Sequence, residues 1–412
     1  MLTPFRPRLL CLPTILFLIA SASVALGQHD PSGVTGGGMI GGSTERSSKP
    51  ATKPATKPAN KPASTTTTPA PRKRTTPATV KGPTPTTPTT PATTVTADSY
   101  YQQGEALYNS KKYREALEPY MRATQINPSM SSALYRIGWI YNDLEEYESA
   151  VDPIRRVIAL QPANAAAHFE LGYAYRKLER FAEALVAFNE TVRHKPDYAA
   201  AHYEIGWILN DQKNYTEAIK SLKLATTYRN GYPDAQNELG YALRHLNRNA
   251  EAIQVYQEAI RLKPDMGLAY LGLGDVYYYN TKQYAEAAKA YKQGLQLRPN
   301  NATALYNLAW CYNDLERYPE AIDELRKAIQ LRPNYPEAHN ELGFSLHQLG
   351  RYAEAVQQYQ MAIRQKTDYA SAHYNLGMSY LEMRNRNGVL EQYRILQRID
   401  NARATRLFSH IK

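Results

Sequence analysis

Four histidines recur at matching intervals and are the first candidates for chemistry in this sequence. His168 and His202 are 34 residues apart, and so are His339 and His373. Imidazole is a common metal ligand, so one hypothesis is an ion shared between neighbouring repeats. If the interval marks stacked helical units, equivalent side chains lie about 10 Å apart, because packed helix axes are separated by roughly 8–10 Å. Metal–nitrogen bonds are only ~2.1 Å long. We therefore expect packed core histidines, no metal and no cofactor.

Motifs typical of catalysis are missing from the sequence. There is no HExxH zinc motif, no phosphate-binding loop and no GxSxG nucleophile turn. The repeats introduced below occupy residues 97–403 and leave no second domain to carry a reaction. We expect that the chain is not an enzyme.

Residues 165–198 contain two amphipathic helical patterns, which divide near Glu179. Gly172 lies in the first pattern and Ala184 in the second. Side chains this small let two helix backbones approach closely, which predicts a helical hairpin. Pro196 lacks a backbone N–H and is expected to end the second helix.

The same spacing, L-G-x2-Y followed by A-x3-F and then P, returns along the chain and resembles the tetratricopeptide repeat (TPR) family. Glycine occupies the matching place at positions 104, 138, 172, 206, 240, 274, 343 and 377, and Ala309 takes the remaining one. One extra residue near Thr281 lengthens the sixth unit. The predicted units are 97–130, 131–164, 165–198, 199–232, 233–266, 267–301, 302–335, 336–369 and 370–403, followed by the end of a capping helix at 404–412.

The resemblance implies an all-α, right-handed α-solenoid in which the first helix of each pair lines the concave side. In the family, the second, fifth, sixth, ninth, twelfth and thirteenth positions of each unit face inward. All three tryptophans fall at the ninth position, and aromatic rings also occupy the fifth position of most units. Acidic residues outnumber basic ones at inward positions by thirteen to four. The predicted concave face is therefore aromatic and acidic, unless the rings only fill gaps between helices and the charges only face solvent.

A second regularity extends over two units and occurs three times. A Trp-Asn-Asp set in one unit is followed by a Glu-aromatic-basic set in the next, which suggests similar pockets repeated along a groove, or an ancestral duplication without selected function. The sets are Trp139, Asn142, Asp143 with Glu170, Tyr173, Arg176; Trp207, Asn210, Asp211 with Glu238, Tyr241, Arg244; and Trp310, Asn313, Asp314 with Glu341, Phe344, His347. The candidate ligand-binding residues are Trp139, Asp143, Glu170, Tyr173, Arg176, Tyr203, Trp207, Asp211, Glu238, Tyr241, Arg244, Tyr306, Trp310, Asp314, Glu341 and Phe344.

The net charge of +11 comes mainly from the segment before the repeats. Eleven basic and two acidic residues precede Ala97, whereas the rest of the chain carries 38 basic and 36 acidic residues. A nucleic-acid-binding domain is expected to show a basic stripe, so nucleic acid is not an expected partner of the array.

The first 96 residues do not resemble the repeats. Residues 1–27 combine two arginines, an apolar run and small residues at candidate cleavage sites, which predicts a secretory signal peptide; an uncleaved membrane anchor is the alternative. Residues 28–96 are rich in Gly and Ser and then in Lys-Pro and Thr-Pro, a composition typical of a disordered linker. This linker could be a spacer, a basic tether to an anionic envelope polymer, or a ligand for the acidic groove itself.

The sequence thus favours an exported, periplasmic or extracellular scaffold without catalytic activity. Its expected partner is an extended peptide or protein segment, neutral to cationic, bound along the concave face. Because aromatic rings also stack on sugar faces, a cell-envelope glycan of the peptidoglycan type is the alternative. The oligomeric state does not follow from the sequence.

Overall fold

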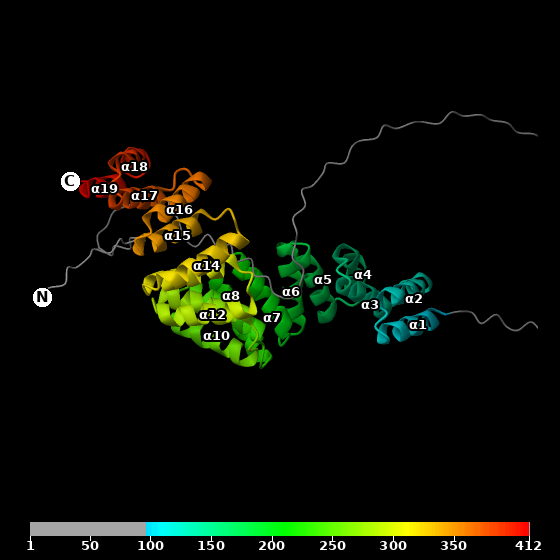
Figure 1. Cartoon of the computed structure of the whole chain (residues 1–412). Helices are drawn as coiled ribbons and strands as arrows, with labels where there is room; N and C mark the ends of the chain where they lie inside the picture. Colours follow the sequence, from blue (N-terminus) through cyan, green and yellow to red (C-terminus); the bar gives the residue numbers. More distant parts are fainter. Residues whose placement is uncertain (1–95, 412) are drawn as a thin grey trace, which may run out of the picture. The chain divides into compact units, whose positions relative to one another are not determined.

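The computed structural model describes residues 96–411, and every regular element in that range is a helix (Figure 1). The predicted signal peptide and all of the predicted linker except Thr96 lie outside the described residues. No helix between residues 96 and 411 has both the length and the apolar character needed to span a bilayer. An all-α solenoid built from helical hairpins is confirmed.

The helices fall into two compact units, with a boundary in the first turn of α3. The described part of one unit, residues 96–133, contains α1 (Ala97–Asn109) and α2 (Tyr113–Ile126). The other unit begins at Leu134. Its helices are α3 (Ser131–Asp143, beginning before the boundary), α4 (Tyr147–Leu160), α5 (Ala165–Lys177), α6 (Phe181–His194), α7 (Ala199–Asp211), α8 (Tyr215–Tyr228), α9 (Pro233–His245), α10 (Asn249–Leu262), α11 (Gly267–Asp275), the π-helix η1 (Val276–Asn280), α12 (Tyr284–Leu297), α13 (Ala302–Asp314), α14 (Tyr318–Leu331), α15 (Pro336–Gln348), α16 (Tyr352–Gln365), α17 (Ala370–Glu382), α18 (Arg386–Ile399) and α19 (Asn401–Ser409).

Each hairpin turn uses one residue in the left-handed backbone region. Between α5 and α6 this residue is Glu179, with φ of 61°, and the amide of Arg180 then donates to the carbonyl of Tyr175 at 2.8 Å. Lysine, glutamate, asparagine or arginine occupies the equivalent place in seven other turns, and Gly350 does so between α15 and α16. A left-handed conformation costs roughly 1–2 kcal/mol for a residue with a Cβ, so most turns carry this cost and one does not. Helix α6 ends at His194, just before Pro196, as predicted.

Close approach of the paired helices depends on the glycine at the eighth position of the first helix. A Cβ at Gly172 would lie 2.7 Å from the ring carbon Cδ1 of Phe188, which is fully buried in α6. Gly240 and Gly343 face Tyr256 and Tyr359 in the same way. The predicted reason for the small residue is confirmed: the ring of the second helix fills the space that a side chain would take.

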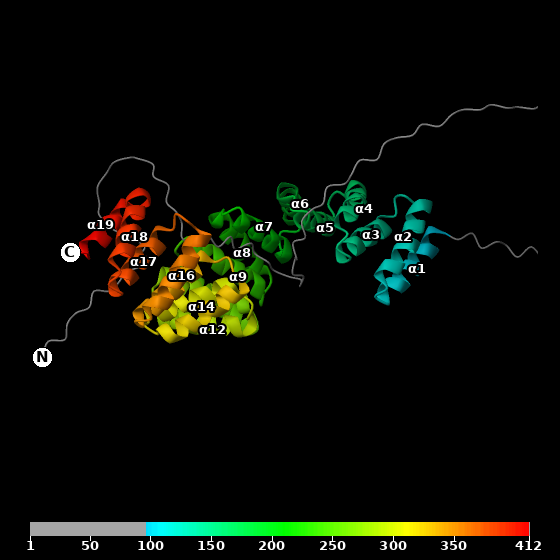
Figure 2. The same ribbon diagram turned by 45° about the horizontal axis from the view of Figure 1, so that its top comes forward.

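Neighbouring hairpins of the unit that begins at Leu134 pack in two layers. Each second helix contacts the next first helix, as α6 does with α7 and α8 with α9. First helices also contact one another across the intervening helix, as α7 does with α9 and α13 with α15. Figure 1 shows the second helices α10, α12 and α14 following one another, and Figure 2 shows α12, α14 and α16 doing the same. The first helices therefore form a continuous layer of their own.

The extra residue of the sixth hairpin is absorbed by η1. The amide of Thr281 bonds to the carbonyl of Val276 at 3.1 Å, five residues back, which is the spacing of a π-turn and accommodates one more residue than an α-turn. Lys282 then takes the left-handed turn position. At the carboxyl end, α19 begins at Asn401, inside the ninth predicted unit, and buries Leu407 against Gly377 of α17.

Candidate binding surface on the first helices

Six ninth-position aromatic residues stand on six first helices of the unit that begins at Leu134, and we call them the ring row. All six are half-buried, so each ring has a packed side and an accessible side. The ring row consists of Trp139 (α3), Tyr173 (α5), Trp207 (α7), Tyr241 (α9), Trp310 (α13) and Phe344 (α15).

The packed side of most of these rings lies against the start of the preceding second helix. The ring of Tyr173 meets Tyr147, the first residue of α4, at 6.2 Å between centroids, and Trp207 meets Phe181, the first residue of α6, at 6.1 Å. Phe344 meets Tyr318 at 6.3 Å in the same way. Edge and tilted contacts of this kind stabilise the junction between hairpins. The rings therefore do fill gaps, as the packing alternative requires, and still leave part of their aromatic surface accessible.

Tyr203 and Tyr306, the two fifth-position candidates, lie deeper than the ring row. Both are buried, and each pairs with a tyrosine that precedes the next first helix: Tyr232 at 5.2 Å and Tyr335 at 5.0 Å. Their rings therefore pack neighbouring hairpins together and leave little surface for a ligand.

The basic member of the first candidate set is held between rings. The guanidinium of Arg176 lies 5.4 Å from the ring centre of Tyr173 and 5.0 Å from that of Trp207, both within the range of cation–π contact. Its Nε lies 2.6 Å from Oε2 of Glu204, and both side chains are largely buried. Burial raises the pKa of Glu204, and the nearby Arg176 acts in the opposite direction. Glu204, which is not among the candidate residues, thus completes a contact between α5 and α7.

Arg244 and His347 occupy the same place in the other two sets and also reach the next hairpin. Nη1 of Arg244 lies 3.7 Å from Oδ2 of Asp275, which in turn accepts a hydrogen bond from the hydroxyl of Tyr291 at 2.6 Å. Nδ1 of His347 lies 2.8 Å from Oγ of Ser379. All three basic residues are therefore engaged with residues of the following first helix.

The asparagine and glutamate of each doubled set bind each other, and we call these contacts the Asn–Glu bridges. Nδ2 of Asn142 donates to Oε2 of Glu170 at 2.8 Å, and Nδ2 of Asn210 donates to Oε2 of Glu238 at 3.0 Å. In both cases the same Nδ2 also donates to the backbone carbonyl of that glutamate at 3.0 Å. The third bridge, from Asn313 to Glu341, is longer at 3.4 Å.

Burial of the Asn–Glu bridges changes the acidity of their carboxyl groups. Desolvation raises the pKa of Glu238 to about 7, and hydrogen bonds from Asn210 and Asn237 act in the opposite direction. Desolvation likewise raises the pKa of Glu341 to about 7, against hydrogen bonds from Asn340 and Asn313. The pKa of Glu170 is also raised by burial. Glu238 and Glu341 are buried and Glu170 is half-buried, and each of the three carboxyl groups is bonded to the asparagine of its doubled set.

The aspartates of the three sets differ from the glutamates because they are exposed. Asp143, Asp211 and Asp314 are the last residues of α3, α7 and α13. Asp314 accepts a hydrogen bond from the hydroxyl of Tyr278 at 2.7 Å and remains open to solvent. The structure thus joins the asparagines, glutamates and basic residues across neighbouring hairpins and leaves the ring row and the aspartates at the surface.

Comparison with solved structures returns several proteins, of which two are described as TPR proteins. YrrB, described as a TPR protein with an unusual peptide-binding site, is 25% identical, with 46% of this chain and 99% of that chain covered and a TM-score of 0.43. PilF of Pseudomonas aeruginosa is 21% identical, with 50% and 94% covered and a TM-score of 0.46. The C-terminal part of a TPR protein of Cytophaga hutchinsonii is 17% identical, with 59% and 99% covered and a TM-score of 0.48. No curated protein matches the chain.

Family models match most of the helical region. Models described as tetratricopeptide repeat match residues 101–165, 143–193, 169–233, 271–336 and 324–357, and a model described as TPR repeat matches 240–281 and 345–383. The matched segments run from 101 to 383 with a single gap at 234–239, in agreement with the hairpins of the structure. The chain therefore belongs to the tetratricopeptide repeat family.

Proposed function

We propose that this chain is an exported, non-catalytic scaffold that binds an extended peptide or protein segment along the ring row. Repeats of this family are typically scaffolds for protein interaction. The observation that carries the proposal is the ring row itself, which presents partly accessible aromatic surface on six first helices of one unit. Aromatic residues on a rigid scaffold bind partners well because they offer a large apolar area at little entropic cost.

The charges around the ring row favour a neutral to cationic segment. Arg176 and Arg244 are largely buried and lie against the carboxylates of Glu204 and Asp275. The aspartates that end α3, α7 and α13 are exposed. The basic groups of the candidate sets are thus engaged inside the stack, and the solvent-facing charges of those sets are negative, which repels anionic ligands.

The experiment is a binding measurement on the full chain with and without the three indoles. Peptides selected by display against the wild-type chain are titrated while the fluorescence of a label on the peptide is followed. We expect Trp139→Leu, Trp207→Leu and Trp310→Leu together to weaken binding at least tenfold, while circular dichroism shows unchanged helicity. Tyr228→Leu, which alters a ring exposed on the second helix α8, is the matched control and should bind as the wild type does.

Unchanged peptide affinity in the triple variant, with the fold intact, would reject binding along the ring row. Soluble peptidoglycan fragments titrated in parallel test the glycan alternative, because indole fluorescence of the wild-type chain responds when a sugar face stacks on the rings. If these fragments bind saturably and display selects no binding peptide, the proposed ligand of the ring row becomes a glycan.

Export is a separate part of the proposal and rests on residues 1–27. Expression of the full chain followed by cell fractionation and N-terminal sequencing tests it. We expect a mature protein that begins near residue 28 and is found outside the cytoplasm. An intact N-terminus in the cytoplasmic fraction would contradict export.

A further inference from the structure

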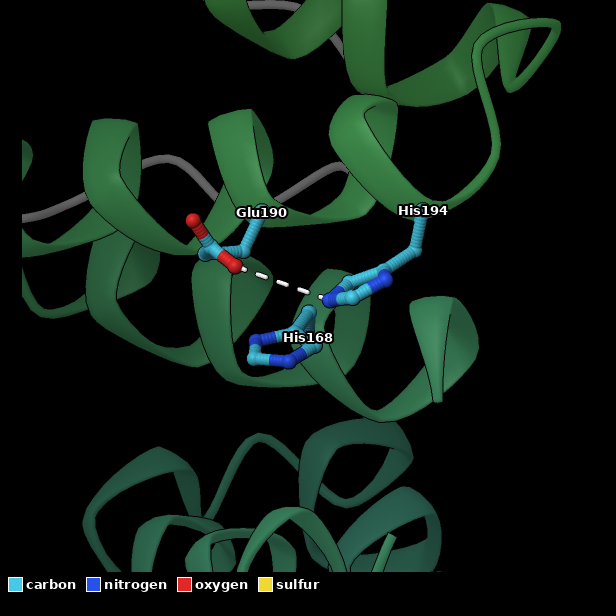
Figure 3. A group of neighbouring side chains, drawn as sticks. All are labelled: His168, Glu190 and His194. Carbon is cyan, nitrogen blue, oxygen red and sulfur yellow. Dashed lines mark ion pairs between the residues drawn. The ribbon is translucent and has the colours of Figure 1, made fainter. Parts of the chain in front are cut away.

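A histidine, a glutamate and a second histidine converge between the two helices of one hairpin (Figure 3). His168 comes from α5, and Glu190 and His194 come from α6. One ligand atom from each of the three residues lies within 4.8 Å of the other two. Figure 3 shows the ring of His194 directed at the carboxylate of Glu190, with the ring of His168 stacked against that of His194. The cluster lies within a single hairpin and does not depend on stacked repeats.

The local fold brings these three side chains together. Glu190 and His194 are four residues apart on α6, so they project from the same face of that helix. His168 faces them from α5, which is held close to α6 by the contact of Gly172 with Phe188. The positions of all three groups are therefore fixed by well-packed helices and not by a loop.

The ring of His168 is oriented as in many metal sites. Its Nε2 lies 2.9 Å from the carbonyl oxygen of Pro162, which can only accept, so Nε2 carries the proton. In the neutral ring the lone pair then belongs to Nδ1. A backbone carbonyl that fixes the tautomer of a ligating histidine in this way is a common outer partner in metal centres.

Arg193 already donates hydrogen bonds to the lone pairs of Glu190 and His194. The guanidinium of Arg193 donates to Oε2 of Glu190 from Nε at 3.0 Å and from Nη2 at 2.6 Å. The same Nη2 lies 2.7 Å from Nε2 of His194, which must therefore accept. Arg193 lowers the pKa of Glu190 through these hydrogen bonds, which keeps the carboxylate charged. Because the Arg193 side chain is 62% exposed, it can leave without loss of packing.

The next hairpin, α7–α8, has a histidine at the position of His168 but neither a glutamate nor a second histidine opposite it. His202 repeats the bond of His168, with its Nε2 2.8 Å from the carbonyl of Pro196. Its ring stacks on Tyr228 at 5.5 Å, as that of His168 stacks on His194 at 5.6 Å. Leu224 stands where Glu190 stands. Ring stacking at this place is satisfied by tyrosine in the next hairpin. The Glu190–Arg193 pair recurs in α10 as Glu258 and Arg261, so the feature that distinguishes the α5–α6 hairpin is the second imidazole beside the carboxylate.

We propose that His168, Glu190 and His194 bind a divalent metal ion of the Zn²⁺ class. Two imidazoles and one carboxylate form a ligand set suited to Zn²⁺, with the fourth position left to water. Ligand atoms around a tetrahedral ion lie about 3.4 Å apart at bond lengths near 2.1 Å. To direct both ring nitrogens at one ion, the ring of His194 must rotate out of its stack on His168, and the Glu190 side chain must shift to that spacing. The ion displaces Arg193 and links α5 to α6.

The test uses the full, tag-free chain and titrates it with Zn²⁺ by calorimetry and with Co²⁺ by visible absorption. We expect one site with the absorption of tetrahedral Co²⁺. His194→Tyr removes a ligand and keeps the stack, as Tyr228 does on His202, and should weaken Zn²⁺ binding at least 100-fold. His202→Gln is the matched control and should leave the affinity unchanged. Arg193→Gln removes the competing cation and should tighten binding severalfold.

Three results would overturn the proposal. A wild-type chain that binds neither ion has no such site. Equal Zn²⁺ affinity of the wild type and the His194→Tyr variant would place the ion elsewhere. Loss of binding in the His202→Gln variant would assign it to the neighbouring hairpin. None of these measurements depends on peptide binding by the ring row.

Discussion

Replacement of Glu238 by glutamine should remove a pH dependence that is built into the stack. The Glu238 carboxyl is 5% exposed and lies under Asn210, which is 4% exposed. Nδ2 of Asn210 donates to Oε2 of Glu238, and Nδ2 of Asn237 lies 3.4 Å from Oε1. Asp234, on the same helix, adds a like charge. A glutamine at this position keeps the acceptor for Asn210 and cannot ionise.

The magnitude follows from the raised pKa of Glu238. Burial moves this pKa from 4.5 to about 7, so the folded state holds a proton that the unfolded chain has already released. Between pH 4.5 and 7 the folded state binds more protons, and the free energy of unfolding therefore falls as the pH rises through this window. Each pKa unit corresponds to about 1.4 kcal/mol, so the full loss above pH 7 is about 3 kcal/mol. Glu341, whose pKa is raised to about 7 as well, contributes a second loss of the same sign.

The assay is urea unfolding of the full chain at pH 5 and pH 8, with tryptophan fluorescence as the signal. Trp207 precedes Asn210 on α7 and so reports on the hairpin that contacts Glu238. We expect the free energy of unfolding of Glu238→Gln to lie close to that of the wild type at pH 5 and above it at pH 8. The difference between variant and wild type should grow by about 2.5 kcal/mol between these two pH values, because part of the loss has already occurred at pH 5. Asp265→Asn, at an exposed site after α10, is the control. It would refute the reasoning if the free energy of unfolding of the wild type rose from pH 5 to pH 8 and Glu238→Gln abolished that rise.

Three further substitutions test the packing and are read from urea midpoints at pH 7. Gly350→Ala should destabilise the chain by about 1 kcal/mol, since φ is 72° and no atom lies within 4 Å of the added Cβ, so only the left-handed backbone conformation opposes it; an unchanged midpoint would contradict this. Gly172→Val should cost about 3 kcal/mol, because even its Cβ overlaps the buried ring of Phe188; full stability would show that the helices can separate freely. Arg176→Ala should cost about 3–5 kcal/mol by leaving Glu204 buried and unpaired, and adding Glu204→Gln should recover part of it; no recovery would show that the lost cation–π packing dominates.

The hairpins could be predicted from the sequence because their signals are local and repeat. A glycine at the eighth position faces a large side chain in the second helix, and both residues return with the same spacing. One glycine alone would have been ambiguous, but eight in register are not. The extra residue near Thr281 could be located in the same way. That it is absorbed as a π-turn, with Lys282 in the left-handed position, could not be predicted, because a loop insertion would preserve the same spacing.

The doubled sets show where pattern alone is insufficient. Their spacing correctly places Asn210 and Glu238 on one surface of successive first helices, and the sequence suggested a pocket. In the structure, Asn210 donates a hydrogen bond of 3.0 Å to Glu238, so the two side chains bind each other and leave no pocket between them. Periodicity gives the direction in which a side chain projects but not how near the next helix lies. The His168, Glu190 and His194 cluster was missed for a related reason: histidines were compared between equivalent positions of different units, whereas the partners lie across one hairpin.

The same limit applies to the charge of the first-helix layer. Counting acidic residues at inward positions treats every carboxylate as a full surface charge. Glu204 instead lies against Arg176, and Glu238 and Glu341 have pKa values raised to about 7, so near neutral pH these two are only partly ionised. The field that a ligand meets therefore comes mainly from exposed groups such as Asp143 and is weaker than the count implies. If peptide binding follows that exposed charge, Asp143→Asn should weaken cationic peptides severalfold at low salt and neutral ones hardly at all. Equal weakening of both peptide classes would mean that Asp143 acts through packing and not through its charge.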